Sequence, residues 1–125
     1  MNLGEPASGA TSIFFWTGTD EGATREYPSK PMIAGVSCSA AAAGLALAAW
    51  CDLRIVDESA VFGVFCQRFG GPMPNGPTIR RPRLIGQSRA IDIISTARVA
   101  DADEAYHIGL TNRLELKGEA RHAAE

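Results

Sequence analysis

Small side chains at residues 40–44 could form a site for a carbonyl oxygen. The run reads Ala-Ala-Ala-Ala-Gly and opens an apolar stretch that extends to Trp50. The first turn of a helix leaves backbone N–H groups without acceptors, and the helix dipole adds positive potential there. Small side chains let a carbonyl approach those amides, which stabilise it as an oxyanion during a reaction. The alternative is close packing, since a helix that is apolar all round is commonly just buried.

Cys66 is a second residue whose chemistry could matter. A thiolate beside an oxyanion-binding turn can carry out acyl transfer, provided that a base activates it. The sequence gives no sign that His107, in a different expected helix, reaches this thiol. The alternative is a buried and inert thiol, which we also expect for Cys38 and Cys51. Because the three cysteines form no Cys-x-x-Cys pair, we expect neither a disulfide framework nor a zinc site.

The basic residues allow two interpretations. Arg80, Arg81 and Arg83 could bind the phosphates of a ligand, but a salt-bridged surface role is the simpler expectation for such a cluster. His107 and His122 lack the spacing of metal ligands, so we expect them on the surface and expect no metal.

Composition narrows the class of partner. The chain has 125 residues and a formal net charge of −2, which gives no electrostatic reason to expect nucleic acid or an anionic membrane. The apolar stretch from residue 40 to 51 is too short to span a bilayer, and the N-terminus does not resemble a signal peptide. Widely spaced cysteines favour a reducing compartment. We expect a cytoplasmic protein, with a mitochondrial location open if the natural N-terminus lies further upstream.

An α/β fold must position these residues. The apolar run 31–36 predicts a strand buried on both faces, residues 40–50 a fully buried helix, and residues 52–56 a second buried strand. Two such strands joined by a crossover helix imply a parallel βαβ unit. We expect Asp52 and Arg54 to pair with each other where the second strand begins.

Further elements follow along the chain. A short strand is expected at 60–63 and a loop at 68–77. Next comes a helix that Pro82 should break, and then a helix capped by Ser88. Asp101 should cap a third helix that ends at Gly109.

Three regions are expected. Residues 1–30 read as an irregular leader whose aromatic residues 13–16 dock on the body, because turn-rich composition marks irregular chain. Residues 31–116 form the core, with an extended final piece at 110–116. Residues 117–125 form a helical or frayed tail.

Between Ser29 and Leu114 the chain resembles the crotonase superfamily, the enoyl-CoA hydratase/isomerase family. The matching segments stand in family order and spacing: SKPMIAGV, AAAAGLALAAWCDLRIV, ESAVFG, TIRRPRLIGQSRAIDII and ADEAYHIGLTNRL. The resemblance implies a partial spiral of ββα turns, with parallel strands and a buried oxyanion helix. It also implies an acyl-CoA thioester as substrate or ligand, and no further cofactor.

The resemblance assigns the small-residue run a role. Family members polarise the thioester carbonyl with two backbone N–H groups, one of them in a Gly-Gly-Gly-Leu motif. That motif aligns with residues 42–45, so the N–H of Ala43 is the implied donor, flanked by Ala42 and Gly44. The second donor lies in a loop well before the strand at 31–36, and residues 1–30 offer no substitute. The resemblance therefore implies a chain truncated at the N-terminus, and at the C-terminus as well.

The chain departs from the family where hydratases carry their acids. Two glutamates activate water and protonate the α-carbon, and their positions correspond here to Ala46 and Cys66. Asn75 stands where we expect an Asp in relatives that share the FGVFC segment, and an amide cannot act as a base. Standard two-glutamate hydration is therefore not expected, and enzymatic activity is left uncertain.

Three functions remain in view. The leading one is an acyl-CoA-binding, crotonase-like protein without the hydratase acids. The second is a non-catalytic, degenerate fragment or a partner of an intact crotonase; separately, a homo-trimer or hetero-association is the expected assembly if the chain is intact. The third is acyl transfer with Cys66 as nucleophile.

Overall fold

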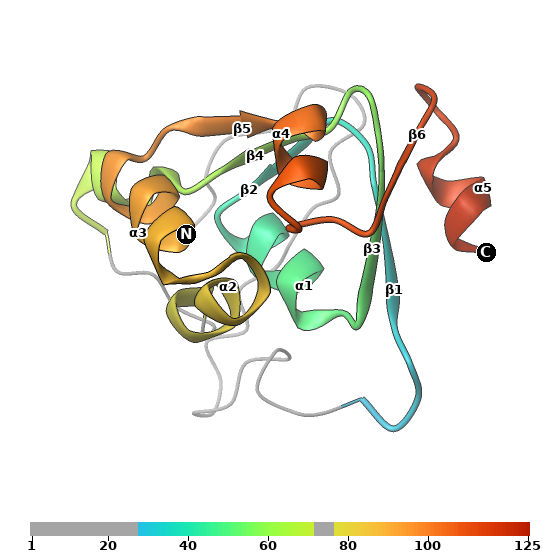
Figure 1. Ribbon diagram of the computed structural model, residues 1–125, viewed down its shortest axis with the longest axis horizontal. Helices are drawn as coiled ribbons and strands as arrows, with labels where there is room; N and C mark the ends of the chain where they lie inside the picture. Colours follow the sequence, from blue (N-terminus) through green and yellow to red (C-terminus); the bar gives the residue numbers. More distant parts are fainter. Residues whose placement is uncertain (1–27, 72–76) are drawn as a thin grey trace.

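Two three-stranded sheets organise the chain in the computed structural model, which describes residues 28–71 and 77–125 (Figure 1). The first sheet is entirely parallel, whereas in the second β2 and β4 are parallel and β4 and β5 antiparallel. The expected aromatic anchor at 13–16 and Asn75 lie outside the described residues. The strands, in sheet order, are β1 (Ile33–Val36), β3 (Leu53–Asp57) and β6 (Arg113–Glu115), then β2 (Ser39–Ala41), β4 (Val61–Gly63) and β5 (Val99–Asp101).

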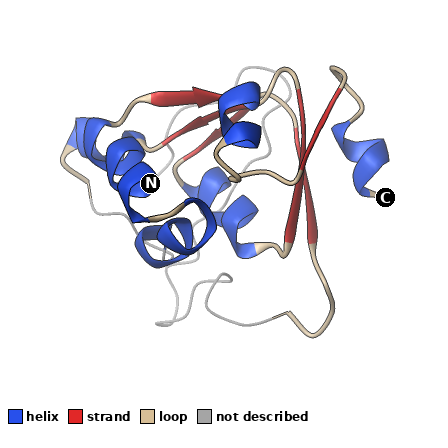
Figure 2. Cartoon of the chain, viewed as in Figure 1, coloured by secondary structure: helices blue, strands red, loops and turns tan. Residues whose placement is uncertain are grey.

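Helices lie on both sides of the first sheet. In Figure 1, α1 and α4 stand on one side of β1 and β3, and α5 stands on the other. Figure 2 shows α2 and α3 packed together below the second sheet. The helices are α1 (Ala43–Trp50), the 3₁₀ helix η1 (Phe65–Phe69), α2 (Pro77–Ile85), α3 (Gln87–Thr96), α4 (Ala102–His107) and α5 (Ala120–Ala124).

The predicted parallel unit is confirmed, but its crossover contains an additional strand. Ile33 pairs with Leu53 and Val36 with Val56 in parallel register. Ala40 and Ala41, expected as the beginning of the helix, instead lie in β2 beside β4, and α1 begins only at Ala43. A short apolar run has no period that separates strand from helix, so pairing with β4 decides its conformation. The unit is a ββα turn, as the family resemblance implied.

The strand at 31–36 is not buried on both faces as expected. Ile33, in β1, and its partner Leu53, in β3, are each 45% exposed. Helix α5 covers the neighbouring position: a Cβ placed on Gly35 would lie 3.1 Å from the carbonyl oxygen of Ala120. The segment 117–125, expected as a helical or frayed tail, thus contains a helix packed on β1.

Two of the helix boundaries were predicted wrongly and two correctly. Helix α2 continues through Pro82. Proline has no N–H, so a single intrahelical hydrogen bond is missing, the one that would run back to the exposed first turn. Gly86, with φ 82°, is the N-cap of α3, so Ser88 lies inside the helix. Asp101 caps α4 as predicted, its carboxylate accepting a bond of 2.8 Å from the N–H of Glu104. Gly109 follows α4 with φ 81°, the left-handed conformation expected there.

A fully buried carboxylate links the segments that follow β1, β3 and β6. Asp57, at the end of β3, accepts bonds of 2.5 Å from the Ser37 hydroxyl and 3.0 Å from the Gly118 N–H. It also accepts bonds from the N–H and the hydroxyl of Ser59, at 2.9 and 2.5 Å. Burial raises the pKa of Asp57, but these hydrogen bonds outweigh burial and hold it below its ordinary value.

Replacing Asp57 with Asn should lower stability by about 2 kcal/mol at neutral pH, because the amide cannot accept every one of these bonds. A depressed native-state pKa stabilises the fold above the unfolded-state pKa of about 3.9, and that stability is lost as pH falls through the native value. The difference between wild type and variant should therefore shrink below about pH 4. Urea unfolding at pH 7, 5 and 3 measures it. A difference that is constant across the series would contradict the role of the ionised carboxylate.

Candidate functional site

The turn that begins α1 has an unusual backbone conformation. Ala42 has φ 47° and ψ −107°, outside the small left-handed region that L-residues tolerate. Such a conformation costs on the order of 1–3 kcal/mol unless the surroundings impose it. Two hydrogen bonds hold it: the Ala42 N–H donates to the Gly63 carbonyl, and the Ala46 N–H donates to the Ala42 carbonyl, both at 3.1 Å. The alanine thus occupies a conformation that suits glycine.

This turn directs the first amides of α1. The first hydrogen bond of the helical pattern runs from the Ala46 N–H to the Ala42 carbonyl. The amides of Ala43, Gly44 and Leu45 lie before this bond, in the turn whose N–H groups have no acceptor within the helix. Leu45 is fully buried, whereas Ala43 and Gly44 are half-buried. The N–H of Ala43, the donor that the resemblance implies, therefore stands at the beginning of α1, where the helix dipole adds positive potential.

The two positions that the resemblance assigns to the hydratase acids carry no carboxylate. Ala46 lies in α1 and is 2% exposed, and Cys66 lies half-buried in η1. Gly63, at the end of β4, stands between these elements in the chain and accepts the bond from Ala42. Neither a methyl group nor a thiol can take the role of a glutamate in water activation.

Cys66 is close to Arg81 rather than to a base. Arg81, expected at the surface, is 1% exposed in α2; burial lowers its pKa to about 10, and the electrostatic interaction with Cys66 opposes that decrease. His107 is exposed on α4, with Nδ1 2.7 Å from the Asp103 carbonyl oxygen. His122 is exposed on α5. The structure therefore does not bring Cys66 and a histidine together.

Arg54 has a different partner from the one predicted. Its guanidinium is buried and donates to backbone carbonyls at the end of α1 and before β6, including 2.7 Å to Cys51 and 2.8 Å to Leu110. The Asp52 carboxylate instead accepts from the N–H of Met32 at 2.8 Å. Burial lowers the pKa of Arg54, while Cys51 and Asp52 raise it less. Arg54 therefore holds the C-terminal end of α1, whose first turn is the candidate site.

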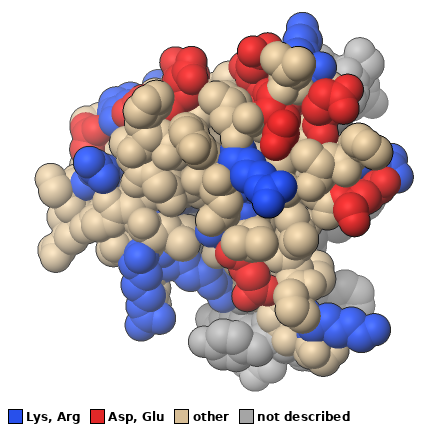
Figure 3. Space-filling view, turned by 45° about the vertical axis from the view of Figure 1, so that its right-hand side comes forward, with Lys and Arg blue, Asp and Glu red and all other residues tan. Residues whose placement is uncertain are grey.

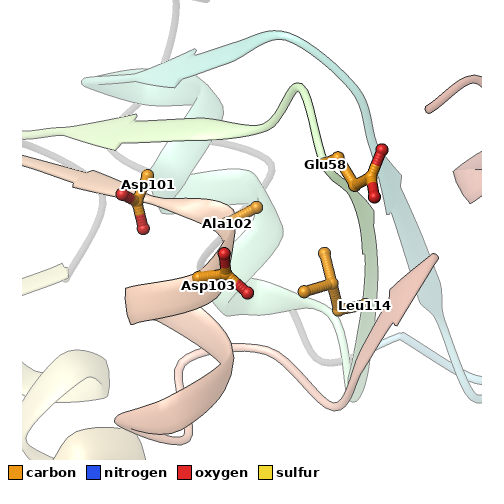
Figure 4. Close-up of a pocket in the computed structure, with 5 residues that line it drawn as sticks. All are labelled: Glu58, Asp101, Ala102, Asp103 and Leu114. Atoms are coloured by element: carbon orange, nitrogen blue, oxygen red, sulfur yellow. The ribbon is translucent and has the colours of Figure 1, made fainter. Parts of the chain in front are cut away.

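One surface hollow of about 200 Å³ lies away from this site (Figure 4). The carboxylate of Asp101, one of the residues that line the hollow, is engaged as the N-cap of α4. Figure 3 shows basic side chains scattered over one face of the molecule rather than joined in a continuous patch. The hollow is lined by Glu58, Asp101, Ala102, Asp103 and Leu114.

Residues 28–71 and 77–125 contain no group of three His, Cys, Asp or Glu side chains placed so that they could hold a metal ion. In the same ranges no helix has the length and apolar character needed to cross a membrane.

The chain forms a ββα turn whose helix begins at a strained residue. These features define the class: an α/β protein of crotonase type. The family model described as Enoyl-CoA hydratase/isomerase matches residues 11–124. The chain belongs to the enoyl-CoA hydratase/isomerase family, which confirms the resemblance.

Named relatives share a limited part of their length with this chain. The crotonyl-CoA hydratase of Syntrophomonas wolfei is 42% identical over 89 residues, which cover 71% of this chain and 34% of that protein. The short-chain-enoyl-CoA hydratase of Clostridium acetobutylicum is 37% identical over 100 residues, covering 80% and 38%. The crystal structure of an enoyl-CoA hydratase from Mycobacterium avium superposes with a TM-score of 0.76 at 28% identity, covering 80% and 45%. The chain thus spans between a third and a half of these proteins.

Proposed function

We propose that this chain binds acyl-CoA thioesters through the first turn of α1 and does not hydrate them by a two-glutamate route. The observation that carries the proposal is the conformation of Ala42, which places the Ala43 amide ahead of the first hydrogen bond of the helix. Preorganised amides of this kind stabilise the oxygen of a polarised carbonyl. Enoyl-CoA hydratases among the relatives make an acyl-CoA the natural ligand class.

The role of each group follows from its chemistry. The Ala43 N–H would donate to the thioester oxygen, and the dipole of α1 would favour negative charge there. Ala46 and Cys66 leave the bound acyl group without a carboxylate to activate water or to protonate carbon. Association with a second copy, or with an intact family member that supplies these groups, stays a proposal. A nucleophilic role for Cys66 has no base to support it among the described residues.

Thermal unfolding of the purified 125-residue chain tests the binding proposal. Saturating crotonyl-CoA should raise the midpoint, because a ligand that binds only the native state stabilises it by about 2.7 kcal/mol at one hundred times its Kd. The matched control is S-butyl-CoA, a thioether that keeps the nucleotide but lacks the carbonyl, and it should raise the midpoint less. A midpoint that neither compound moves would refute acyl-CoA binding, and equal shifts would refute recognition of the carbonyl.

A further inference from the structure

Ala42 cannot maintain its conformation alone, so the structure around it must impose the strain. A non-glycine residue at φ 47° relaxes toward negative φ unless neighbouring groups prevent it. The hydrogen bond on its N-terminal side goes to the carbonyl of Gly63. The position of Gly63 therefore decides whether the turn survives.

Gly63 is held by an aromatic ring. A Cβ built on Gly63 would lie 2.2–2.8 Å from ring atoms of Phe65, so the ring occupies the space that a side chain at 63 would need. Gly63 is buried in β4, where it pairs with Ala41, the residue before Ala42. A ring in this place blocks movement of the Gly63 backbone toward it.

Phe65 is in turn held by Arg68. The guanidinium carbon of Arg68 lies 5.0 Å from the centroid of the Phe65 ring, within the range of a cation–π interaction. Nη2 of Arg68 donates to the carbonyl of Ala97 at 2.7 Å. Ala97 is the buried C-cap of α3, with φ 51°, so this hydrogen bond attaches the arginine to the end of α3.

We propose that Phe65 and Arg68 are positioning residues that clamp the strained turn at Ala42 and thereby aim the first amides of α1 at the ligand. The clamp runs from the end of α3 through Arg68, Phe65 and Gly63 to Ala42, with each link made by a contact described above. Its effect on a bound thioester rests on the proposed function, whereas its effect on the turn does not. Phe69, 85% exposed in the same 3₁₀ helix, is outside the clamp.

The first test needs no ligand. Ala42→Gly relieves the strain and should raise the folding equilibrium constant about tenfold in the wild-type chain. In a Phe65→Ala background the turn has already relaxed, so the same change should raise the constant less than threefold. A Phe69→Ala background should keep the full tenfold gain. Equal gains in all three backgrounds, from urea unfolding, would show that residues 42 and 65 are not coupled and would overturn the clamp. If Phe65→Ala does not fold, Arg68→Met replaces it in the same cycle.

The second test uses trans-cinnamoyl-CoA, whose absorption moves to longer wavelength when hydrogen bonds polarise its carbonyl. At saturation, Phe65→Ala should lose at least half of the wild-type shift, and Phe69→Ala should keep it. Adding Ala42→Gly to Phe65→Ala should restore most of the shift, since glycine adopts the turn without strain. An unchanged shift in Phe65→Ala, or no restoration by Ala42→Gly, would contradict positioning. A wild-type chain that gives no shift would refute the proposed function, while the unfolding cycle would still decide the clamp.

Discussion

Arg54→Met should destabilise the chain by about 3 kcal/mol or more. The guanidinium donates to the carbonyls of Leu110 and Cys51 at 2.8 and 2.7 Å, with longer bonds to Ala48 and Asp52 at 3.4 and 3.3 Å. Methionine fills similar space but leaves these buried acceptors unmatched, and each unsatisfied buried group costs about 1–3 kcal/mol. Part of the loss is offset because burying the charge is itself unfavourable, as the lowered pKa of Arg54 indicates.

Urea unfolding measures this loss, with Arg113→Met, at an exposed position of β6, as the matched control. The control should unfold within about 0.5 kcal/mol of wild type. Arg54→Lys should fall between wild type and Arg54→Met, because a single ammonium cannot reach the acceptors that the planar fork serves. If Arg54→Met were as stable as Arg113→Met, the account of Arg54 as the support of α1 would fail.

Ala46→Glu should destabilise the chain by about 3 kcal/mol at pH 7 without producing hydratase activity. Ala46 is a buried residue of α1, 2% exposed, so the new carboxylate would be buried, and burial raises the pKa of a carboxyl group. The dipole at the start of α1 offsets part of that cost. The second acid position would still be Cys66, so neither role in hydration would be complete.

Ala46→Gln, equal in size and neutral, separates charge from volume. The Glu variant should be less stable than the Gln variant at pH 7 and approach it as pH falls, since a raised native pKa makes the penalty vanish below the unfolded value of about 4.3. Hydration is followed through the ultraviolet absorbance of crotonyl-CoA. Clear turnover by Ala46→Glu alone would show that the missing acids are not what limits this chain.

Local signals predicted some elements well. Asp101 caps the first turn of α4 with its side chain, and Gly109 adopts the left-handed backbone conformation after the helix ends. Both preferences act within one turn of helix, so the sequence alone was enough to identify these residues. Strands β1 and β3 were identified from their apolar runs, and their parallel pairing followed from the helix between them.

Features that depend on distant partners were missed. The strand β2 exists because of its pairing with β4, and its alanines carry no period that indicates a strand. The burial of Arg54 and Arg81 was not predicted, because it depends on how α1 and α2 pack. The contact between Phe65 and Arg68 had one local signal, a spacing of three residues that allows the side chains to meet on a helix.

The candidate site itself was predicted in part. The resemblance implied Ala43 as the donor, a role that stays a proposal, and the structure shows only that this residue begins α1. What the sequence could not give was the conformation of Ala42, because alanine does not favour a positive φ and only the surrounding contacts impose it.

The most direct test of the central claim is the infrared carbonyl frequency of crotonyl-CoA labelled with ¹³C at the thioester carbon, measured bound to the chain and free. Hydrogen bonds from the first turn of α1 draw electron density to the oxygen and weaken the C=O bond, so the bound frequency should be lower than the free one. A bound thioester whose carbonyl frequency equals that of the free compound would contradict polarisation by this turn.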